Sequence, residues 1–132
     1  SLDIRVDRRS PTSHGNGVNT GIAFRVQDYS NYCYLAASSP NLDGTGSTGV
    51  IGHKIANVNT FVSGLIALPA SWTTLRVITK PDGTLECYAD ATLFYSTPLA
   101  QFASQTGAGL FTETFGQALS NRWDNFTVFA AP

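Results

Sequence analysis

Residues 73–90, TTLRVITKPDGTLECYAD, contain two stretches in which apolar and polar residues alternate on either side of a short turn. A period of two is typical of β-strands that bury one face. In the turn Pro81-Asp82-Gly83, proline presets the backbone and glycine accepts a left-handed conformation. Opposing Lys80 with Thr84 then divides the hairpin into two faces. The predicted inner face carries Leu75, Val77, Thr79, Leu85, Cys87 and Ala89, and the outer face carries Thr74, Arg76, Ile78, Glu86, Tyr88 and Asp90.

A second hairpin is predicted upstream, with strands Gly21–Gln27 and Tyr32–Ala37 around the turn at 28–31. Opposing Gln27 with Tyr32 places alternate residues on opposite faces of the hairpin. The predicted inner face carries Ile22, Phe24, Val26, Cys33 and Leu35, and the outer face carries Arg25, Gln27, Tyr32 and Tyr34.

Further short strands are predicted along the rest of the chain, near residues 2–7, 50–56, 60–66, 93–96, 109–114 and 122–130. Many short strands joined by turns favour an all-β fold, a two-sheet antiparallel β-sandwich. A length of 132 residues suits one such domain spanning 1–132. Because the chain begins at Ser1 and contains no methionine, we expect it to be a fragment or processed part of a longer protein.

The composition excludes several kinds of partner. Charged residues make up only 13% of the chain and the net charge is −1, so we expect no nucleic-acid partner. No run of about 18 apolar residues occurs, so we expect no membrane insertion. The G-x-G-x-x-G pattern at residues 44–49 lies in a polar loop with no helical pattern after it, which does not suit a dinucleotide site. The two histidines and two cysteines lack zinc-site spacing.

Four stretches, in their order and spacing, carry a resemblance to a known superfamily. They are GIAFRVQDYSNYCYLAA (21–37), WTTLRVITKPDGTLECYADATLFYS (72–96), GAGLF (107–111) and RWDNFTVF (122–129). Together they resemble the laminin-G-like jelly rolls of the concanavalin A-like lectin/glucanase superfamily. The resemblance implies two antiparallel sheets, one of them concave, with loops at the rim. The chain departs from the pattern at Asp90-Ala91, where the superfamily usually has Asp-Gly, so this turn is expected to differ.

That superfamily includes lectins, adhesion domains, glycosidases and viral or phage appendage domains, so the fold does not choose a function. Hydrolysis of a glycosidic bond needs two carboxyl groups about 5–10 Å apart. The superfamily's glucanases place acidic residues at every second position of one strand. Here Glu86 and Asp90 share a face but lie four positions apart, which separates their backbones by about 13 Å. No G-x-S-x-G nucleophile elbow occurs either, and we expect no enzymatic activity.

A binding surface follows if both hairpins belong to the same sheet. Their outer faces would then combine tyrosine rings with planar polar groups, which suits stacking on sugar rings and hydrogen bonding to hydroxyl groups. A protein interface fits equally well, because tyrosine and arginine are enriched there too. The predicted ligand-binding residues are Arg25, Tyr32, Tyr34, Arg76, Glu86, Tyr88 and Asp90.

Calcium is the one cofactor that the sequence leaves open, since sandwich lectins often hold it in rim loops with carboxylate and amide oxygens. The candidate ligands are Asp124 and Asn125, with Asp28 and the pair Asn41 and Asp43 as further oxygen donors. The alternative is that Asp124 accepts backbone N–H groups and holds a neighbouring loop. No other cofactor is expected.

Two pairs of residues have alternatives that concern packing. Cys33 and Cys87 both point inward in the predicted registers, so they form either a disulfide between strands or two small buried apolar groups. Trp72 and Trp123 adjoin inward-facing runs and are expected to anchor the core or its rim.

The function that these features favour is non-catalytic, lectin-like recognition of a glycan or a cell-surface receptor. The first alternative is a structural or decorating domain of a virion or extracellular appendage, which packs in a multimer with copies of itself or with neighbouring structural subunits. The second is an accessory carbohydrate-binding domain of a secreted glycoside hydrolase. The expected location is extracellular, either secreted or on a virion surface.

Overall fold

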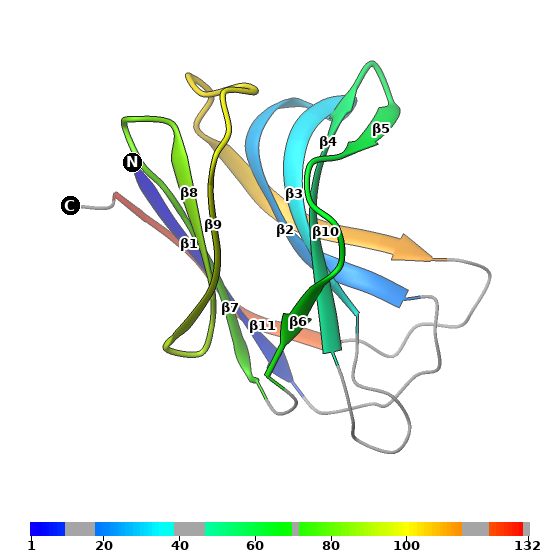
Figure 1. Ribbon diagram of the computed structural model, residues 1–132, viewed down its shortest axis with the longest axis vertical. Coiled ribbons are helices and arrows are strands. Elements are labelled where there is room, and N and C mark those ends of the chain that lie inside the picture. The colour runs from blue at the N-terminus through cyan, green and yellow to red at the C-terminus, as the bar shows by residue number, and fades with distance from the viewer. Residues whose placement is uncertain (10–17, 39–46, 70–71, 115–121, 131–132) are drawn as a thin grey trace.

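The computed structural model describes residues 1–9, 18–38, 47–69, 72–114 and 122–130, which form two β-sheets that face each other (Figure 1). None of the described segments is a helix long and apolar enough to cross a membrane. The strands, in chain order, are β1 (Leu2–Arg9), β2 (Val18–Asp28), β3 (Asn31–Ser38), β4 (Ser47–Ile55), β5 (Val58–Phe61), β6 (Ile66–Leu68), β7 (Thr74–Thr79), β8 (Thr84–Ala89), β9 (Thr92–Pro98), β10 (Gly107–Thr114) and β11 (Arg122–Ala130).

Five strands form the first sheet, sheet A, in the order β11-β1-β7-β8-β9. Sheet B has the order β10-β2-β3-β4-β5, with β6 also paired to β4. The strand pairs within the described residues are antiparallel, so the predicted two-sheet antiparallel sandwich is confirmed. The first and last strands are neighbours in sheet A, where Leu2 lies opposite Ala130.

The β7–β8 hairpin has the predicted register, with Leu75 opposite Ala89 and Thr79 opposite Leu85. Gly83 in its turn has a φ of 87°, which glycine adopts without the steric cost of a side chain. Burial alternates residue by residue along both strands. The predicted inner and outer faces of this hairpin are therefore confirmed.

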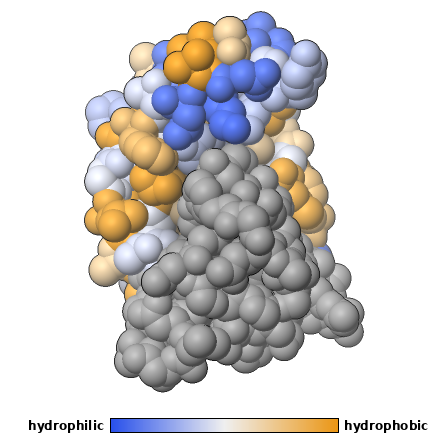
Figure 2. Space-filling model, turned by 90° about the vertical axis from the view of Figure 1, so that its right-hand side faces the viewer, coloured by the Kyte–Doolittle hydropathy of each residue, from blue (hydrophilic) through white to orange (hydrophobic). Residues whose placement is uncertain are grey.

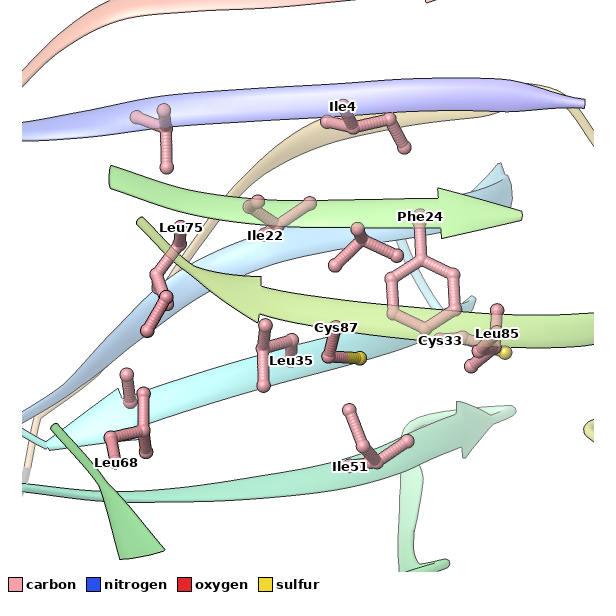
Figure 3. Close-up of a cluster of buried hydrophobic side chains, with 14 of the residues drawn as sticks. Ile4, Ile22, Phe24, Cys33, Leu35, Ile51, Leu68, Leu75, Leu85 and Cys87 are labelled. Atoms are coloured by element: carbon pink, nitrogen blue, oxygen red, sulfur yellow. The ribbon is translucent and has the colours of Figure 1, made fainter. Parts of the chain in front are cut away.

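The core fills the space between the sheets, where apolar side chains of both inner faces meet (Figure 3). Trp72 belongs to this core and is only 2% exposed, as predicted, whereas the side chain of Trp123 lies outside the described part of the chain. Cys33 and Cys87 are both buried in the core as free thiols, which agrees with the apolar alternative and not with a disulfide. Burying each large apolar side chain stabilises the fold by about 1.5–3 kcal/mol.

The β2–β3 hairpin departs from the predicted register. Phe24, and not Val26, lies opposite Cys33, and Ala23 lies opposite Tyr34. The pairing is irregular between Phe24 and Asp28, as at a β-bulge, in which one strand carries extra residues. The predicted inward position of Val26 is wrong, because Val26 packs in the outer cluster that contains Ala23 and Tyr34.

Arg25 occupies the position at which the alternation breaks. Its φ of 49° lies in the left-handed region, where a residue with a side chain is strained. The residue is only 2% exposed, so the predicted outward position of Arg25 opposite Tyr34 is wrong. The bulge turns the arginine to the inside and leaves the following valine on the outside.

Candidate functional site

The two hairpins that carry the predicted binding residues belong to different sheets, β7–β8 to sheet A and β2–β3 to sheet B. Arg76, Glu86 and Tyr88 therefore lie on the outer face of sheet A, while Tyr32 and Tyr34 lie on the outer face of sheet B. These faces are on opposite sides of the sandwich (Figure 1). The expectation of one common surface, which required a shared sheet, is wrong, and each face has to be considered separately.

On sheet A, a buried carboxylate organises two arginines. Asp3 on β1 accepts hydrogen bonds from Nε and Nη2 of Arg5, at 3.1 and 2.7 Å, and from Nε and Nη2 of Arg76, at 2.8 and 2.7 Å. Burial raises the pKa of the Asp3 carboxyl group, but the arginine hydrogen bonds outweigh it and hold the pKa well below its usual range. The guanidinium groups of Arg5 and Arg76 also lie 5.7 and 5.1 Å from the ring centroids of Phe129 and Tyr88.

The neighbouring polar residues of this face are paired with one another. The Glu86 carboxylate accepts hydrogen bonds from Lys80 Nζ and, at 2.9 Å, from the Tyr88 hydroxyl. These two hydrogen bonds lower the pKa of Glu86, and the bond from Lys80 has the larger effect. Glu86 is therefore an ionised partner in a surface network and does not have the raised pKa of a general acid.

Asp90 has a structural position at the β8–β9 turn, where its φ is 53°. Its Oδ1 atom accepts hydrogen bonds from the backbone N–H groups of Thr73 and Thr74, both at 3.0 Å, and from the Thr73 hydroxyl. The carboxylate thus fixes the start of β7 against the turn.

Arg25, the remaining predicted ligand-binding residue, joins the two sheets from inside. Its Nη1 atom donates to the carbonyl groups of Leu99 and Gln101, the second at 3.2 Å, and its Nη2 atom donates to the carbonyl of Gly83 at 3.1 Å. Burial lowers the pKa of the guanidinium, and its Nε atom is buried without a partner. The side chain ties β2 to the β7–β8 turn and to the segment after β9.

The outer face of sheet B has a floor of small residues crossed by one buried ring. Tyr34 is 1% exposed and packs with Ala23 and Ala36, and its hydroxyl donates to Asn59 Oδ1. Gly52 makes this position possible, because a Cβ atom there would lie 2.3 Å from the Tyr34 hydroxyl oxygen. Tyr34 is therefore part of the floor and presents little ring surface to a ligand.

Tyr32 lies at the edge of this floor, half-buried. Its ring meets the Tyr34 ring edge-on, with centroids 6.4 Å apart, and Lys54 Nζ lies 6.0 Å from the Tyr32 centroid. The ring is thus held between a tyrosine and a lysine, and Asn59 on the next strand lies opposite Lys54.

Among the residues that the structure describes, two hollows are found on this face, one on either side of the floor. The first, of about 270 Å³, is lined by Ala36, Thr48, Gly49, Val50, Phe61, Ser63, Gly64 and Leu65. The second, of about 280 Å³, is lined by Ala23, Val26, Asp28, Tyr29, Tyr32, Ala108, Gly109 and Leu110. Figure 2 looks onto this side of the molecule and shows apolar patches toward both margins of the described surface.

Each hollow has an exposed aromatic residue that the sequence analysis did not select. Phe61 in the first hollow is 65% exposed, and Tyr29 in the second is 87% exposed. The sequence does show that Tyr29 lies in a predicted turn and that Phe61 lies in a short predicted strand, where aromatic side chains are often exposed. Their proximity to the floor of sheet B depends on the strand order, which the sequence pattern did not reveal.

Within the described residues, no group of three or more histidine, cysteine, aspartate or glutamate side chains could hold a metal ion, and calcium binding stays a prediction. Asn125 has a φ of 50° and donates from Nδ2 to Asp7 Oδ2 at 2.9 Å, so its amide joins β11 to β1. Asp28 accepts hydrogen bonds from the Ser30 N–H group and the Asn31 amide within its own turn. The side chain of Asp124 and the loop containing Asn41 and Asp43 lie outside the described residues.

No protein-family model, no curated protein and no solved structure matches this chain. What the two outer faces can bind is therefore inferred from their own geometry and chemistry.

Proposed function

We propose that this domain is a non-catalytic, lectin-like recognition module and that it binds a glycan across the outer face of sheet B. The fold would be that of a laminin-G-like jelly roll of the concanavalin A-like superfamily. The observation that carries the proposal is the pair of shallow apolar hollows, each next to an exposed aromatic residue, Phe61 and Tyr29. Binding sites for small ligands are usually lined by apolar and aromatic groups with a few polar groups that fix orientation.

The polar groups at these hollows suit hydroxyl-rich ligands. Ser63 and Thr48 line the first hollow and Asp28 lines the second, while Lys54 and Asn59 lie at the edge of the floor between them. The pKa of Asp28 is lowered by hydrogen bonds, the largest effect coming from the backbone N–H of Ser30, so its carboxylate remains an acceptor at neutral pH. An extended oligosaccharide would stack on the two aromatic residues and span the small-residue floor between them.

The first test is a glycan array probed with the purified domain, with and without calcium. For any glycan that binds, Phe61→Ala and Tyr29→Ala should each weaken the affinity about tenfold, the loss typical of a truncated aromatic contact. Phe129→Ala and Tyr88→Ala are matched controls on sheet A and should leave the affinity within twofold. A blank array at high protein concentration, or losses confined to the sheet A variants, would refute the proposal.

A second candidate function, a structural domain that packs in a multimer, is favoured by strand β11. This strand lies at the edge of sheet A, and Phe126, Val128 and Phe129 are 38%, 43% and 51% exposed. Long apolar edge strands favour pairing with another chain. Sedimentation of the wild type and of Val128→Lys tests this role, because a lysine on the edge should abolish a multimer that depends on it.

Both roles suit an extracellular location, in a secreted protein or on a virion surface, and the glycan site would equally suit an accessory domain of a secreted glycoside hydrolase. A glycan-specific interaction without self-association would favour the recognition role. A stable multimer without glycan affinity would favour the structural one.

A further inference from the structure

The outer face of sheet A carries a group of charged side chains that the proposed glycan site does not use. Directly opposite each other on β1 and β7 lie Arg5 and Arg76. Like charges in this arrangement repel, and here Asp3 lies between them as a shared acceptor. One carboxylate balances only one of the two guanidinium groups, so this cluster retains a positive charge.

The retained charge is accessible, whereas the carboxylate is not. The side chains of Arg5 and Arg76 are 43% and 29% exposed, and that of Asp3 is 6% exposed. Each arginine uses its Nε and Nη2 atoms on Asp3, and within the described chain its Nη1 atom has no hydrogen-bond partner. Two guanidinium edges are therefore left to face a second acceptor.

The two arginines are also held in place before any partner arrives. Asp3 binds each of them through two hydrogen bonds, and the rings of Phe129 and Tyr88 pack against them. Side chains that are already ordered lose less conformational entropy on binding, and a fixed guanidinium fork matches the geometry of a carboxylate.

We propose that this surface, the arginine face formed by Arg5, Arg76, Phe129 and Tyr88, docks an acidic peptide segment of a partner protein. The partner would present carboxylates to the two Nη1 edges while the rings provide apolar contact. Arginine and aromatic residues on a sheet surface have the composition of the core of a protein interface. Because one face of each ring is already covered by a guanidinium, this face offers less stacking area to a sugar than the hollows of sheet B do.

The proposal does not depend on the glycan site, because the two faces lie on opposite sides of the sandwich. A blank glycan array would leave it unchanged, and a glycan that binds sheet B should not compete with the peptide.

The test is a titration, followed by fluorescence anisotropy, of a labelled hexaglutamate peptide with the purified domain at low ionic strength. Hexaglutamine is the neutral control peptide. Arg5→Gln and Arg76→Gln should each weaken hexaglutamate binding about tenfold, as expected for loss of a charge-assisted contact. Lys54→Gln removes the same charge from the opposite face and should change the affinity less than twofold. Added salt should weaken binding, since the contacts are exposed.

Several outcomes would overturn the proposal. They are the absence of saturable hexaglutamate binding, equal binding of hexaglutamine, and an equal loss in Lys54→Gln. A fourth is a sulfated tetrasaccharide that binds in an Arg76-dependent manner when hexaglutamate does not, which would assign the face to a sugar. If Arg76→Gln lowers the melting temperature so far that it does not fold, Arg5→Gln and Arg76→Lys carry the comparison, because both retain one full fork on Asp3.

Discussion

Replacing Arg25 by methionine removes the guanidinium that joins the two sheets and keeps a side chain of similar length. Three hydrogen bonds to the carbonyl groups of Gly83, Leu99 and Gln101 are lost. The thioether cannot donate to any of them, so the buried contact to the Leu99 carbonyl is lost outright. The Gly83 carbonyl keeps the backbone N–H of Leu99 at 3.1 Å, and the Gln101 carbonyl keeps the weak Cys33 thiol donor at 3.6 Å. We expect Arg25→Met to lower the free energy of unfolding.

The size of the effect follows from two opposing terms. A hydrogen bond to a charged group contributes about 1.5–3 kcal/mol net, so three such bonds contribute about 5–9 kcal/mol. In the opposite direction, the substitution relieves the cost of burying a charge, which is several kcal/mol. The lowered pKa of Arg25 agrees with this, because burial disfavours the charged form of its guanidinium. The balance is a destabilisation of about 2–4 kcal/mol, a large share of the 5–15 kcal/mol typical of a domain.

Urea unfolding followed by tryptophan fluorescence measures this difference, since Trp72 is buried in the core. Lys54→Met is the matched control, because it removes a cation from the exposed surface of sheet B and should cost less than about 1 kcal/mol. Comparing Arg25→Gly with Arg25→Ala isolates the backbone, and glycine should be the more stable by about 1 kcal/mol because φ is 49°. An Arg25→Met variant as stable as the wild type would refute the role given to the three carbonyl contacts.

Three further outcomes are expected. Burial raises the pKa of the Cys33 thiol to about 11 and that of Cys87 to about 12. Iodoacetamide at pH 8 should therefore label neither thiol in the folded protein and both after unfolding, as measured by mass spectrometry. Labelling without denaturant would contradict their burial. The pKa of Asp3 is lower in the folded than in the unfolded protein, so the carboxylate stabilises the fold above the unfolded pKa near 3.8 and this contribution is lost as the pH falls below 3.8. Asp3→Asn should therefore flatten the fall in melting temperature between pH 4 and pH 2. An unchanged slope would count against the paired carboxylate. Gly52→Ala should lower the free energy of unfolding, measured in urea, by about 1–3 kcal/mol, because the new Cβ atom would overlap the Tyr34 hydroxyl. Gly64→Ala is the control and should be nearly neutral, because the space around Gly64 is open. Equal effects would argue against the close approach at Gly52.

The parts of the fold that the sequence predicted are those in which pattern and turn chemistry agree. In the β7–β8 hairpin, strict alternation and a proline–glycine turn lead to the same register, and the structure confirms it. The span of β11, 122–130, was also predicted, because aromatic and β-branched residues recur along RWDNFTVFA. Local patterns of this kind need no knowledge of strand order.

The predicted β2–β3 register is wrong because a β-bulge adds residues to one strand and so interrupts the alternation of inward and outward side chains. An arginine is assigned to the outer face by any binary pattern, since charged groups are rarely buried. Its burial here depends on carbonyl groups from Gly83, Leu99 and Gln101, which lie far away in the sequence. No local pattern could have indicated those acceptors.

The candidate site could be predicted only in part, because it too depends on which strands are neighbours in space. Tyr32, Tyr34 and Tyr88 were selected as outward-facing, and all three belong to outer faces, but the sequence did not indicate that they lie on different sheets. Tyr34 is also covered, because Gly52 on the neighbouring strand lets its ring lie against the sheet. Predicted face and actual exposure are different properties, and only the second decides what a ligand can reach.

The pairing of β1 with β11 in sheet A has a consequence for the order of folding. Leu2 and Ala130 lie opposite each other although nearly the whole chain separates them in sequence. On the ribosome, β1 emerges before β11 and has no partner on that side until β11 has been made, at about 5–20 residues per second. Contacts this distant in sequence slow folding, because the ends of a long loop must meet before the contacts form. The edge of β1 that β11 later covers is therefore available to other chains during that interval, and sheet A is complete only once β11 has joined it.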